Sequence, residues 1–480
     1  MTVRELADKR HAAFLPAMAR PAVPRATGPD TLSRPSPSLT RTLPLLALTL
    51  LVHGVVLLMV FPALHEDVVL RGTLTLFYHD GGRTLAGAVP YRDFLFEYPP
   101  GALVFIALPR LFAAGFLAYR TAFFVEMTLL DAAIVCTLFA CARMASLPVA
   151  RVLGIYSLGL LLLGPLVDYR IDLAPVALTA LAILAWQRDR LTLAAVLLGL
   201  ATGTKAYPLL LLPALLLDPW LRGRWREGWR ALCGFSAALA LTLSPLLFGG
   251  PAGIAATLRF QLDRHLQVES IWATVPLLLH RLTGFPLEVL GRERALVVIG
   301  PGDAAGRAGT FVLGAVALVI YVRIWRQGRV RARAAIDAPR PSPGVHDSSP
   351  SRTGTGPAGT TSSVVLASTT ALLLADTVLS KVLSPQYLLW TLPSIALLPL
   401  HSRRAVAVVV VFLVALPLTQ WIYPLHYGEL VRLITPRAVA VLTLRNLLLA
   451  AALILLLAMP WESTAVSGSS RQPAHPAGEA

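Results

Sequence analysis

Long apolar runs follow one another along most of this chain, separated by short polar segments that are rich in arginine. The first run, Leu43 to Leu64, is longer than the apolar part of a signal peptide and predicts an uncleaved membrane span. Hydrophobic residues make up 56% of the 480 residues and charged residues only 14%, which is more apolar than a soluble core can absorb. The pattern predicts an all-α, polytopic integral membrane protein with about twelve transmembrane helices. The expected spans are residues 43–64, 119–142, 152–167, 173–186, 191–202, 207–217, 231–248, 311–321, 364–379, 388–400, 405–418 and 438–459.

Basic residues are concentrated in alternate loops between these runs. Arg143 and Arg151 follow the second expected span, and four arginines between Arg222 and Arg230 follow the sixth. Because cytoplasmic loops carry the excess of positive charge, both termini are expected in the cytoplasm and the first long loop outside the cell membrane. The net charge of +16 forms no single basic face, so membrane lipids and not nucleic acid are the expected surroundings.

Polar stretches divide the chain into two expected membrane halves. Proline-rich, serine-rich and basic segments without apolar periodicity predict disordered cytoplasmic tails and linkers. The predicted parts are a tail (1–42), an N-terminal membrane half (43–326) with a large external loop (65–118), a basic low-complexity linker (327–361), a C-terminal membrane half (362–460) and a polar tail (461–480). Within the external loop, Gly101 to Phe112 is too short for a crossing and is expected to dip into the membrane.

The external loop contains a polar and aromatic run that resembles a binding site more than a connection. Residues Tyr91 to Pro100 hold two carboxylates, Asp93 and Glu97, and a second tyrosine, Tyr98. The two prolines at the end of this run lack backbone donors and restrict the preceding residue, so a stiff exit is expected. A solvated loop tip is the simpler explanation of such a run.

The lysines of the chain stand out because arginine supplies almost every other positive charge. Only Lys9, Lys205 and Lys381 occur, and the last two fall on the expected external side. Lysine is a compact point charge that suits a phosphate which must bind and then leave. Either side chain could instead snorkel from the end of a short apolar segment. The other polar residues expected outside are Asp80, Asp93, Glu97, Arg170, Asp172, His265, Glu269, Gln386 and Tyr387.

Two further patterns have structural explanations. Leu258, Leu262, Leu266 and Glu269 recur at helical spacing and predict an amphipathic helix at the membrane interface. On this stripe His265 is expected to be structural rather than catalytic, and Asp172 beside Arg170 is equally readable as an exposed ion pair. The three cysteines lie in apolar runs without histidines at ligand spacing, so neither a disulfide framework nor a metal site is expected.

Five motifs occur in the order in which they are found in a known family. The chain resembles glycosyltransferase family 87, membrane enzymes of the GT-C superfamily that depend on polyprenyl-phosphate sugars and include actinobacterial lipid mannosyltransferases. The motifs are Gly87-Ala88-Val89-Pro90-Tyr91-Arg92-Asp93 with Glu97-Tyr98-Pro99-Pro100, Arg170-Ile171-Asp172, Gly199 to Pro208, Leu266-Gln267-Val268-Glu269-Ser270, and Leu383-Ser384-Pro385-Gln386-Tyr387-Leu388-Leu389-Trp390.

This resemblance implies an inverting transfer of a hexose, with mannose expected, from a polyprenyl-phosphate sugar to a lipid or glycan acceptor outside the membrane. It implies an external-loop aspartate as general base. Similar proteins carry that aspartate about five residues before the position of Tyr78, where this chain has Thr73 and no acid. The expected catalytic residues are therefore Asp80 and Asp93, with Asp67 as a further choice. The expected substrate-binding residues are Glu97, Tyr98, Arg170, Asp172, Lys205, Tyr207, His265, Glu269, Lys381, Gln386 and Tyr387.

Two alternatives to an active transferase stay open at this point. A transporter or lipid flippase would carry paired repeats and charges at mid-membrane, for which Glu126, Asp131 and Asp376 are the nearest matches. These acids are equally consistent with helix packing or with support of a site. An inactive glycosyltransferase relative with a scaffolding role would explain the missing acid at Thr73. No cofactor is expected, and a need for divalent metal cannot be read from the sequence.

Overall fold

Apolar helices packed along a common direction form most of the protein. The computed structural model describes residues 39–64, 68–262, 264–292, 295–299, 301–337 and 357–461. Seven helical stretches within these residues are long and apolar enough to cross a membrane: Thr42–Ala63, Phe116–Met144, Val149–Val167, Trp225–Ala255, Ala304–Val330, Arg403–Leu425 and Pro436–Ala458. Shorter apolar helices at Leu173–Gln187, Leu191–Thr204, Tyr207–Leu221 and Ser363–Leu379 lie between them in the chain. The prediction of a helical multi-pass membrane protein is confirmed.

The α-helices follow the expected spans closely. The first group consists of α1 (Leu39–Val55), α2 (Phe61–Leu64), α3 (Val68–Leu85), α4 (Ala102–Leu111), α5 (Phe116–Met144), α6 (Val149–Leu163), α7 (Leu173–Gln187), α8 (Leu191–Thr204) and α9 (Leu212–Leu221). The second consists of α10 (Trp225–Leu243), α11 (Gly250–Leu262), α12 (Ile271–Thr283), α13 (Pro301–Asp337), α14 (Pro357–Leu379), α15 (Leu388–Ala396), α16 (Arg403–Gln420), α17 (Tyr427–Val431) and α18 (Pro436–Ala458). Short 3-10 or π segments continue several of them, namely η1 (Val56–Val60), η2 (Gly164–Val167), η3 (Tyr207–Leu211), η4 (Ser244–Gly249), η5 (Pro385–Tyr387) and η6 (Trp421–Leu425).

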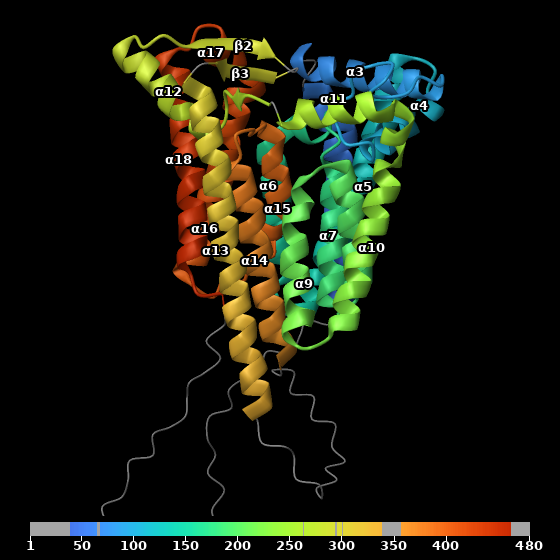
Figure 1. Cartoon of the computed structure of the whole chain (residues 1–480), viewed down its shortest axis with the longest axis vertical. Helices are drawn as coiled ribbons and strands as arrows, with labels where there is room; N and C mark the ends of the chain where they lie inside the picture. The colour runs from blue at the N-terminus through green and yellow to red at the C-terminus, as the bar shows by residue number, and fades with distance from the viewer. Residues whose placement is uncertain are drawn as a thin grey trace, which may run out of the picture. The chain divides into compact units, whose positions relative to one another are not determined.

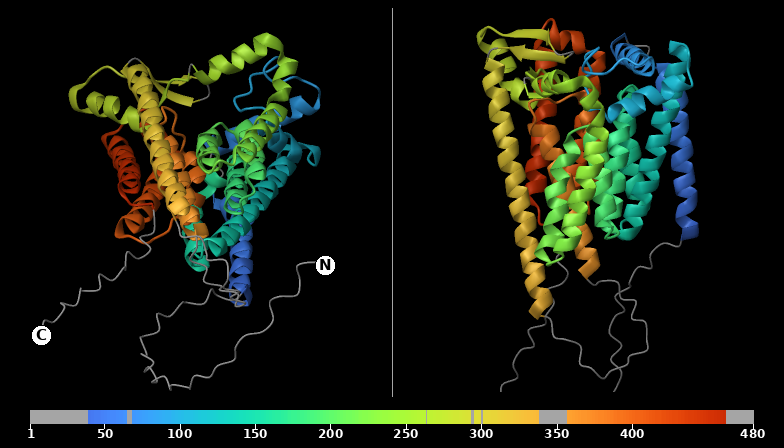
Figure 2. Two further views of the ribbon diagram at one scale, coloured as in Figure 1. Left: turned by 60° about the horizontal axis from the view of Figure 1, so that its bottom comes forward. Right: turned by 45° about the vertical axis from the view of Figure 1, so that its right-hand side comes forward.

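A layer of short elements covers one end of the helix bundle. Figure 1 shows α3, α4 and α11 lying across this end, together with α12, α17 and the strands. The short helix α4 packs against α3 within this layer and does not run down the bundle. The lower ends of α13 and α14 lie at the opposite end of the bundle (Figures 1 and 2).

The covering layer contains the one described sheet, which an all-α prediction leaves out. Strand β3 (Ala295–Ile299) lies between β1 (Leu266–Gln267) and β2 (Glu288–Arg292), and both pairings are antiparallel. The stripe from Leu258 to Glu269 is therefore not one helix. Helix α11 ends at Leu262, and Leu266 pairs with Val298 in the sheet. Helical spacing of apolar residues did not detect this change because β1 is only two residues long.

Two predicted boundaries shift. Helix α1 begins at Leu39, and helices α13 and α14 extend to Asp337 and from Pro357, so both ends of the predicted linker 327–361 are helical. The rest of that linker, most of the predicted tails and Asp67 lie outside the described residues. Helix α13 packs against both α9 and α14, so helices before and after the predicted linker are in contact.

A buried polar network ties three membrane helices together. His53 on α1 lies 2.6 Å from the Asp131 carboxylate on α5, and its other ring nitrogen lies 2.8 Å from the Ser157 hydroxyl on α6. The Tyr156 hydroxyl donates to the second Asp131 oxygen at 2.7 Å. Polar side chains inside a membrane bundle are satisfied by such contacts between helices. Asp131 therefore has a packing role, one of the two explanations considered for the intramembrane acids.

Candidate functional site: a polar cavity beneath the covering layer

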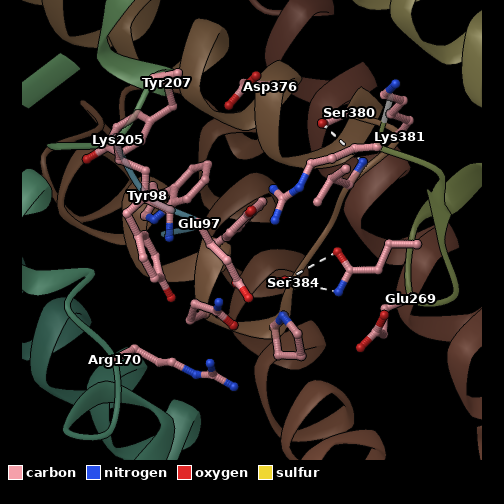
Figure 3. Close-up of a pocket in the computed structure, with 18 of the residues that line it drawn as sticks. Glu97, Tyr98, Arg170, Lys205, Tyr207, Glu269, Asp376, Ser380, Lys381 and Ser384 are labelled. Carbon is pink, nitrogen blue, oxygen red and sulfur yellow. Dashed lines mark hydrogen bonds between the residues drawn. The ribbon is translucent and has the colours of Figure 1, made fainter. Parts of the chain in front are cut away.

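A cavity of about 1140 Å³ lies where several helices are interrupted at the covered end of the bundle. Figure 3 shows its polar side chains facing one another, with Lys205, Tyr207 and Tyr98 on one side and Lys381, Ser384 and Glu269 on the other. The described lining residues include Gly72, Thr73, Glu97, Tyr98, Arg170, Lys205, Tyr207, Arg264, Gln267, Glu269, Thr310, Asp376, Ser380, Lys381, Ser384, Gln386, Tyr387, Trp390, Tyr423 and Tyr427. The lining combines cations, carboxylates and aromatic rings, as in a site for a charged organic ligand.

Lys205 reaches the cavity because helix α8 ends directly before it. Its backbone is extended (φ −156°, ψ 140°), and the following η3 segment carries Pro208, which cannot continue the hydrogen-bond ladder of α8. The backbone N–H of Gly101 donates to the Gly203 carbonyl at 2.8 Å. This bond fastens the Tyr-Pro-Pro exit of the first loop to the end of α8.

The end of α8 is positioned by glycines that allow helix α10 to approach. A Cβ added at Gly199 would lie 2.5 Å from the Phe235 carbonyl oxygen, and one added at Gly203 would overlap the Thr242 hydroxyl. Glycines four residues apart permit this close packing between membrane helices. The glycines of the sequence motif from Gly199 to Pro208 are thus explained by the close packing of α8 against α10.

The Lys205 ammonium is held by one carboxylate and surrounded by aromatic rings. Its Nζ lies 2.7 Å from Asp172 Oδ1, and the Trp390 indole donates to the same oxygen at 2.6 Å. The ammonium also lies 5.0–5.5 Å from the ring centroids of Tyr98, Tyr387 and Trp390. We call this group the lysine cage. Because a lysine ammonium has three donors, two remain for a ligand after the bond to Asp172.

Arg170 supplies a second cation on the cavity wall. It donates to the Tyr423 hydroxyl at 2.8 Å, and its Nε is buried without a hydrogen-bond partner among the described residues. The neighbouring Asp172 is completely buried and bonds to Lys205. Arg170 and Asp172 are therefore not an exposed ion pair, which corrects that alternative. They occupy a tight turn between η2 and α7 that directs the two side chains to different partners.

The opposite wall is built from two chain segments that bond to each other. The Gln267 backbone N–H donates to the Lys381 carbonyl at 3.1 Å, and the Gln267 side chain donates to the Ser384 hydroxyl at 3.0 Å (Figure 3). Gln386 follows in η5, and its side-chain oxygen is buried without a described hydrogen-bond partner. Lys381 and Gln386 thus line the same cavity as Lys205, although they follow a different helix.

Glu269 is a buried carboxylate on this wall. It lies 1% exposed in the turn between β1 and α12, and Oε2 has no hydrogen-bond partner among the described residues. The Arg445 guanidinium on α18 fixes the turn by donating to the Glu269 carbonyl at 2.9 Å. Burial raises the pKa of Glu269 to about 7, while hydrogen bonds from Tyr427 and Gln267 oppose that rise.

The structure does not bring Asp80 or Asp93 to the cavity. Asp93 accepts from the Arg92 side chain at 2.8 Å and from the Val89 backbone N–H at 2.8 Å, and these bonds hold its pKa down at about 2. Asp80 is buried within helix α3, where a Cβ at Gly81 would lie 2.8 Å from the Ile106 carbonyl oxygen. The pair Gly81-Gly82 therefore allows helix packing and not a sharp loop.

Other positions were placed as follows. Thr73, where the resembling proteins carry an aspartate, does line the cavity. Glu97 lines it too, whereas His265 precedes β1 and is not among the lining residues. Sequence reasoning missed Tyr423 and Tyr427, which belong to a helix break that has no motif. It named Asp376 as a membrane acid that could pack helices or support a site, but not as a binding residue. Within the described residues no group of three or more histidine, cysteine, aspartate or glutamate side chains is arranged to hold a metal ion.

Comparisons with known proteins agree with a membrane enzyme that acts on sugars. The family model described as glycosyltransferase family 87 matches residues 96–338, which contain most of the cavity motifs. The fold and this match define a membrane glycosyltransferase. The chain belongs to glycosyltransferase family 87, as its motifs suggested.

Two other comparisons add less. No curated protein matches the chain significantly. Among solved structures, ArnT from Cupriavidus metallidurans bound to undecaprenyl phosphate is 16% identical, over 87% of this chain and 77% of that chain, with a TM-score of 0.34. A TM-score this low does not establish a shared detailed fold.

Proposed function

We propose that the protein transfers a hexose, with mannose as the expected sugar, from a polyprenyl-phosphate donor to a lipid or glycan acceptor. The observation that carries this proposal is the lysine cage, an ammonium fixed by Asp172 beside Arg170 at the wall of a cavity within a membrane bundle. Two cations at one wall suit a phosphate diester, since charge-assisted hydrogen bonds are the strongest that a protein offers to such a group. Apolar residues such as Leu209, Leu210 and Leu313 line the same cavity and suit the lipid part of a donor.

The cavity faces the outer side of the membrane in this proposal. Arg143, Arg188 and Arg224 lie at the ends of α5, α7 and α9, in the loops at the end of the bundle away from the covering layer. The positive-inside bias places that end in the cytoplasm. The start of α1 and the end of α18 lie on that side (Figures 1 and 2), so these two helix ends are then cytoplasmic.

Glu269 is the general base that the geometry favours. The acceptor hydroxyl oxygen bonds to the anomeric carbon, the bond from that carbon to the phosphate oxygen breaks, and polyprenyl phosphate leaves. The hydroxyl proton passes to Glu269. A base on the wall opposite the lysine cage suits an inverting displacement, in which the attacking and leaving oxygens lie on opposite faces of the sugar. A pKa of about 7 also suits a base that works near neutral pH.

Glu97 has a different part in the proposal. It lines the cavity between the two walls (Figure 3) but belongs to the stiff segment before Pro99 and Pro100. A side chain on such a segment is suited to orienting the substrate. Asp80 and Asp93, which lie away from the cavity, take no catalytic part.

The test is transfer by the purified protein in nanodiscs. Polyprenyl-phosphate mannose with radiolabelled sugar is supplied together with a lipid extract from a strain that lacks the gene, and product lipids and glycans are profiled. The proposal expects a labelled product that requires the protein and falls by about 10²- to 10⁴-fold in Glu269→Gln. Absence of any labelled product with mannose and with the other common hexose donors would contradict it. Movement of the lipid between leaflets without transfer would favour a flippase.

A further inference from the structure

Asp376 is an acid on a membrane helix whose carboxylate has no partner in the described part of the chain. It lies near the end of α14 and lines the cavity. Within the described residues its side chain makes no hydrogen bond and no ion pair, whereas Asp131 has two bonds and Asp172 has two. Ionisable groups inside a membrane protein are costly unless they serve a partner or a ligand. We therefore expect a group of a bound ligand to pair with the Asp376 carboxylate.

The surroundings of Asp376 connect it to the lysine cage. Its carboxylate interacts electrostatically with the hydroxyl groups of Tyr207 and Tyr321. Both hydroxyls are used elsewhere, since Tyr207 bonds to Thr179 at 3.2 Å and Tyr321 donates to the Leu210 carbonyl at 2.7 Å. The Tyr207 ring stacks on Trp390 with centroids 4.3 Å apart. Asp376 and Lys205 thus line the same cavity, and Figure 3 shows Asp376 between Tyr207 and Ser380.

We propose that Asp376 binds hydroxyl groups of the donor's sugar ring while Lys205 holds the donor's phosphate. This inference rests on the proposed function and names the sugar-recognition residue of the same site. An ionised carboxylate only accepts hydrogen bonds, and its two oxygens can receive two neighbouring hydroxyls of a pyranose. Tyr207 and Tyr387 stack on Trp390 with centroids 4.3 and 3.7 Å away, and the outer faces of these two tyrosine rings provide an apolar surface for the C–H face of that sugar.

The charges around the site favour a sugar over a second cation. The nearby ammonium of Lys205 is already matched by Asp172. The Asp376 carboxylate lines the cavity that also has to hold the sugar attached to the donor's phosphate. Neutral hydroxyl donors satisfy the carboxylate without adding another charge. The inference also explains why an acid at this position is compatible with an otherwise apolar helix.

The test compares two lipids that differ only in the sugar. Affinities for polyprenyl phosphate and for polyprenyl-phosphate mannose of the same chain length are measured in nanodiscs for wild type, Asp376→Asn, Asp376→Ala and Lys205→Met. Asp376→Ala is expected to lower the affinity for the sugar-bearing lipid by about 10- to 100-fold, because hydrogen bonds to a charged group are lost. Its affinity for polyprenyl phosphate should stay within about twofold of wild type. Lys205→Met should lower the affinity for both lipids.

A matched control is available in helix α5. Glu126 is another membrane acid whose two oxygens are buried without described hydrogen-bond partners, but it does not line the cavity. Glu126→Gln should leave the preference for the sugar-bearing lipid unchanged. Asp376→Asn keeps the side-chain shape and removes an unpaired charge, so it should fold at least as stably as wild type.

The outcomes separate this inference from the proposed function. If wild type prefers the sugar-bearing lipid and both Asp376 variants keep that preference, Asp376 is not the sugar-recognition residue. If the variants lose affinity for both lipids equally, Asp376 acts on the phosphate or on the fold, and the inference also fails. If wild type itself binds no polyprenyl-phosphate sugar, the proposed function fails before Asp376 is tested.

Discussion

Lys205 and Trp390 donate to the same oxygen of Asp172, at 2.7 Å and 2.6 Å, although they lie 185 positions apart in the chain. The two donors come from the break after α8 and from the first turn of α15. A single buried carboxylate therefore fixes both the cation that faces the cavity and the ring that covers it. This relationship makes separable predictions for stability and for donor use.

Asp172→Asn is expected to destabilise the protein strongly. Removing one partner of a buried pair leaves the other charge uncompensated, which costs about 3–5 kcal/mol. The side chains are 0% and 11% exposed for Asp172 and Lys205, so solvent compensates little. Thermal unfolding in nanodiscs measures the loss. The double variant Asp172→Asn with Lys205→Met should recover most of the stability and none of the transfer activity; a double variant no more stable than the single one would contradict the pairing.

Substitutions of the two cavity lysines should affect use of the donor. Lys205→Met and Lys381→Met remove positive charge from opposite walls, so the KM for the polyprenyl-phosphate sugar should rise in each. Lys381→Met should keep the fold, whereas Lys205→Met leaves the buried Asp172 carboxylate unpaired and should also lower stability, so donor affinity is measured on the folded fraction. Lys205→Arg should rescue little, because a planar guanidinium does not fit a cage built around a compact ammonium. Initial rates against donor concentration test this. Unchanged KM values in both methionine variants would show that neither lysine contributes to donor binding.

Activity should rise with pH through about pH 7. The pKa of Glu269 is raised to about 7, so the carboxyl is protonated and inactive as a base below that value and ionised above it. The groups that face it are Tyr427, Gln267 and Arg445. A pH profile of kcat/KM measures the effect. Glu269→Gln should lower activity and abolish this rise.

Asp93→Asn provides the contrast for Glu269. Because Asp93 is an exposed ion pair with Arg92 outside the cavity lining, its loss should leave stability almost unchanged and the pH profile intact. A large loss of turnover in Asp93→Asn, with Glu269→Gln near wild type, would return the catalytic role to the first external loop.

The sequence was sufficient for the span pattern because length and hydropathy determine which runs can cross a bilayer. It was also sufficient to single out Lys205 and Lys381, since rare lysines among arginines are visible without a structure. It could not identify the partner of Lys205. Asp172 looked like the neighbour of Arg170, and only the turn between η2 and α7 shows that the two point to different partners.

Other features depend on packing that leaves no local signal. The choice of Asp80 came from its proximity along the chain to Thr73, but Asp80 lies about two turns further along helix α3, where it is buried and does not line the cavity as Thr73 does. Tyr423 and Tyr427 enter the cavity through a break at η6 that apolar periodicity cannot indicate. The two-residue strand β1 interrupts a stripe that has helical spacing.

Gly203→Ala should disturb the position of Lys205 although residue 203 does not itself line the cavity. An added Cβ would overlap the Thr242 hydroxyl on α10, so α8 and α10 must separate, and overpacking of this kind costs about 1–3 kcal/mol. Because Lys205 follows two residues later, donor affinity should fall together with the thermal midpoint. Gly154→Ala on α6 is the control, since nothing lies within 4 Å of its added Cβ. Equal behaviour of the two variants would show that close approach at Gly203 is not needed.

The orientation of the cavity can be tested with single cysteines. Cys136, Cys141 and Cys233 are first replaced by alanine, and one cysteine is then introduced at Ala114 in the covering layer or at Ala150 at the start of α6. Both positions are exposed, unlike Tyr119, which is buried and unsuitable for labelling. The arginine distribution predicts that a membrane-impermeant maleimide labels Ala114→Cys in intact cells and Ala150→Cys only after permeabilisation. The reverse pattern would place the cavity in the cytoplasm and exclude a donor or acceptor restricted to the outer leaflet.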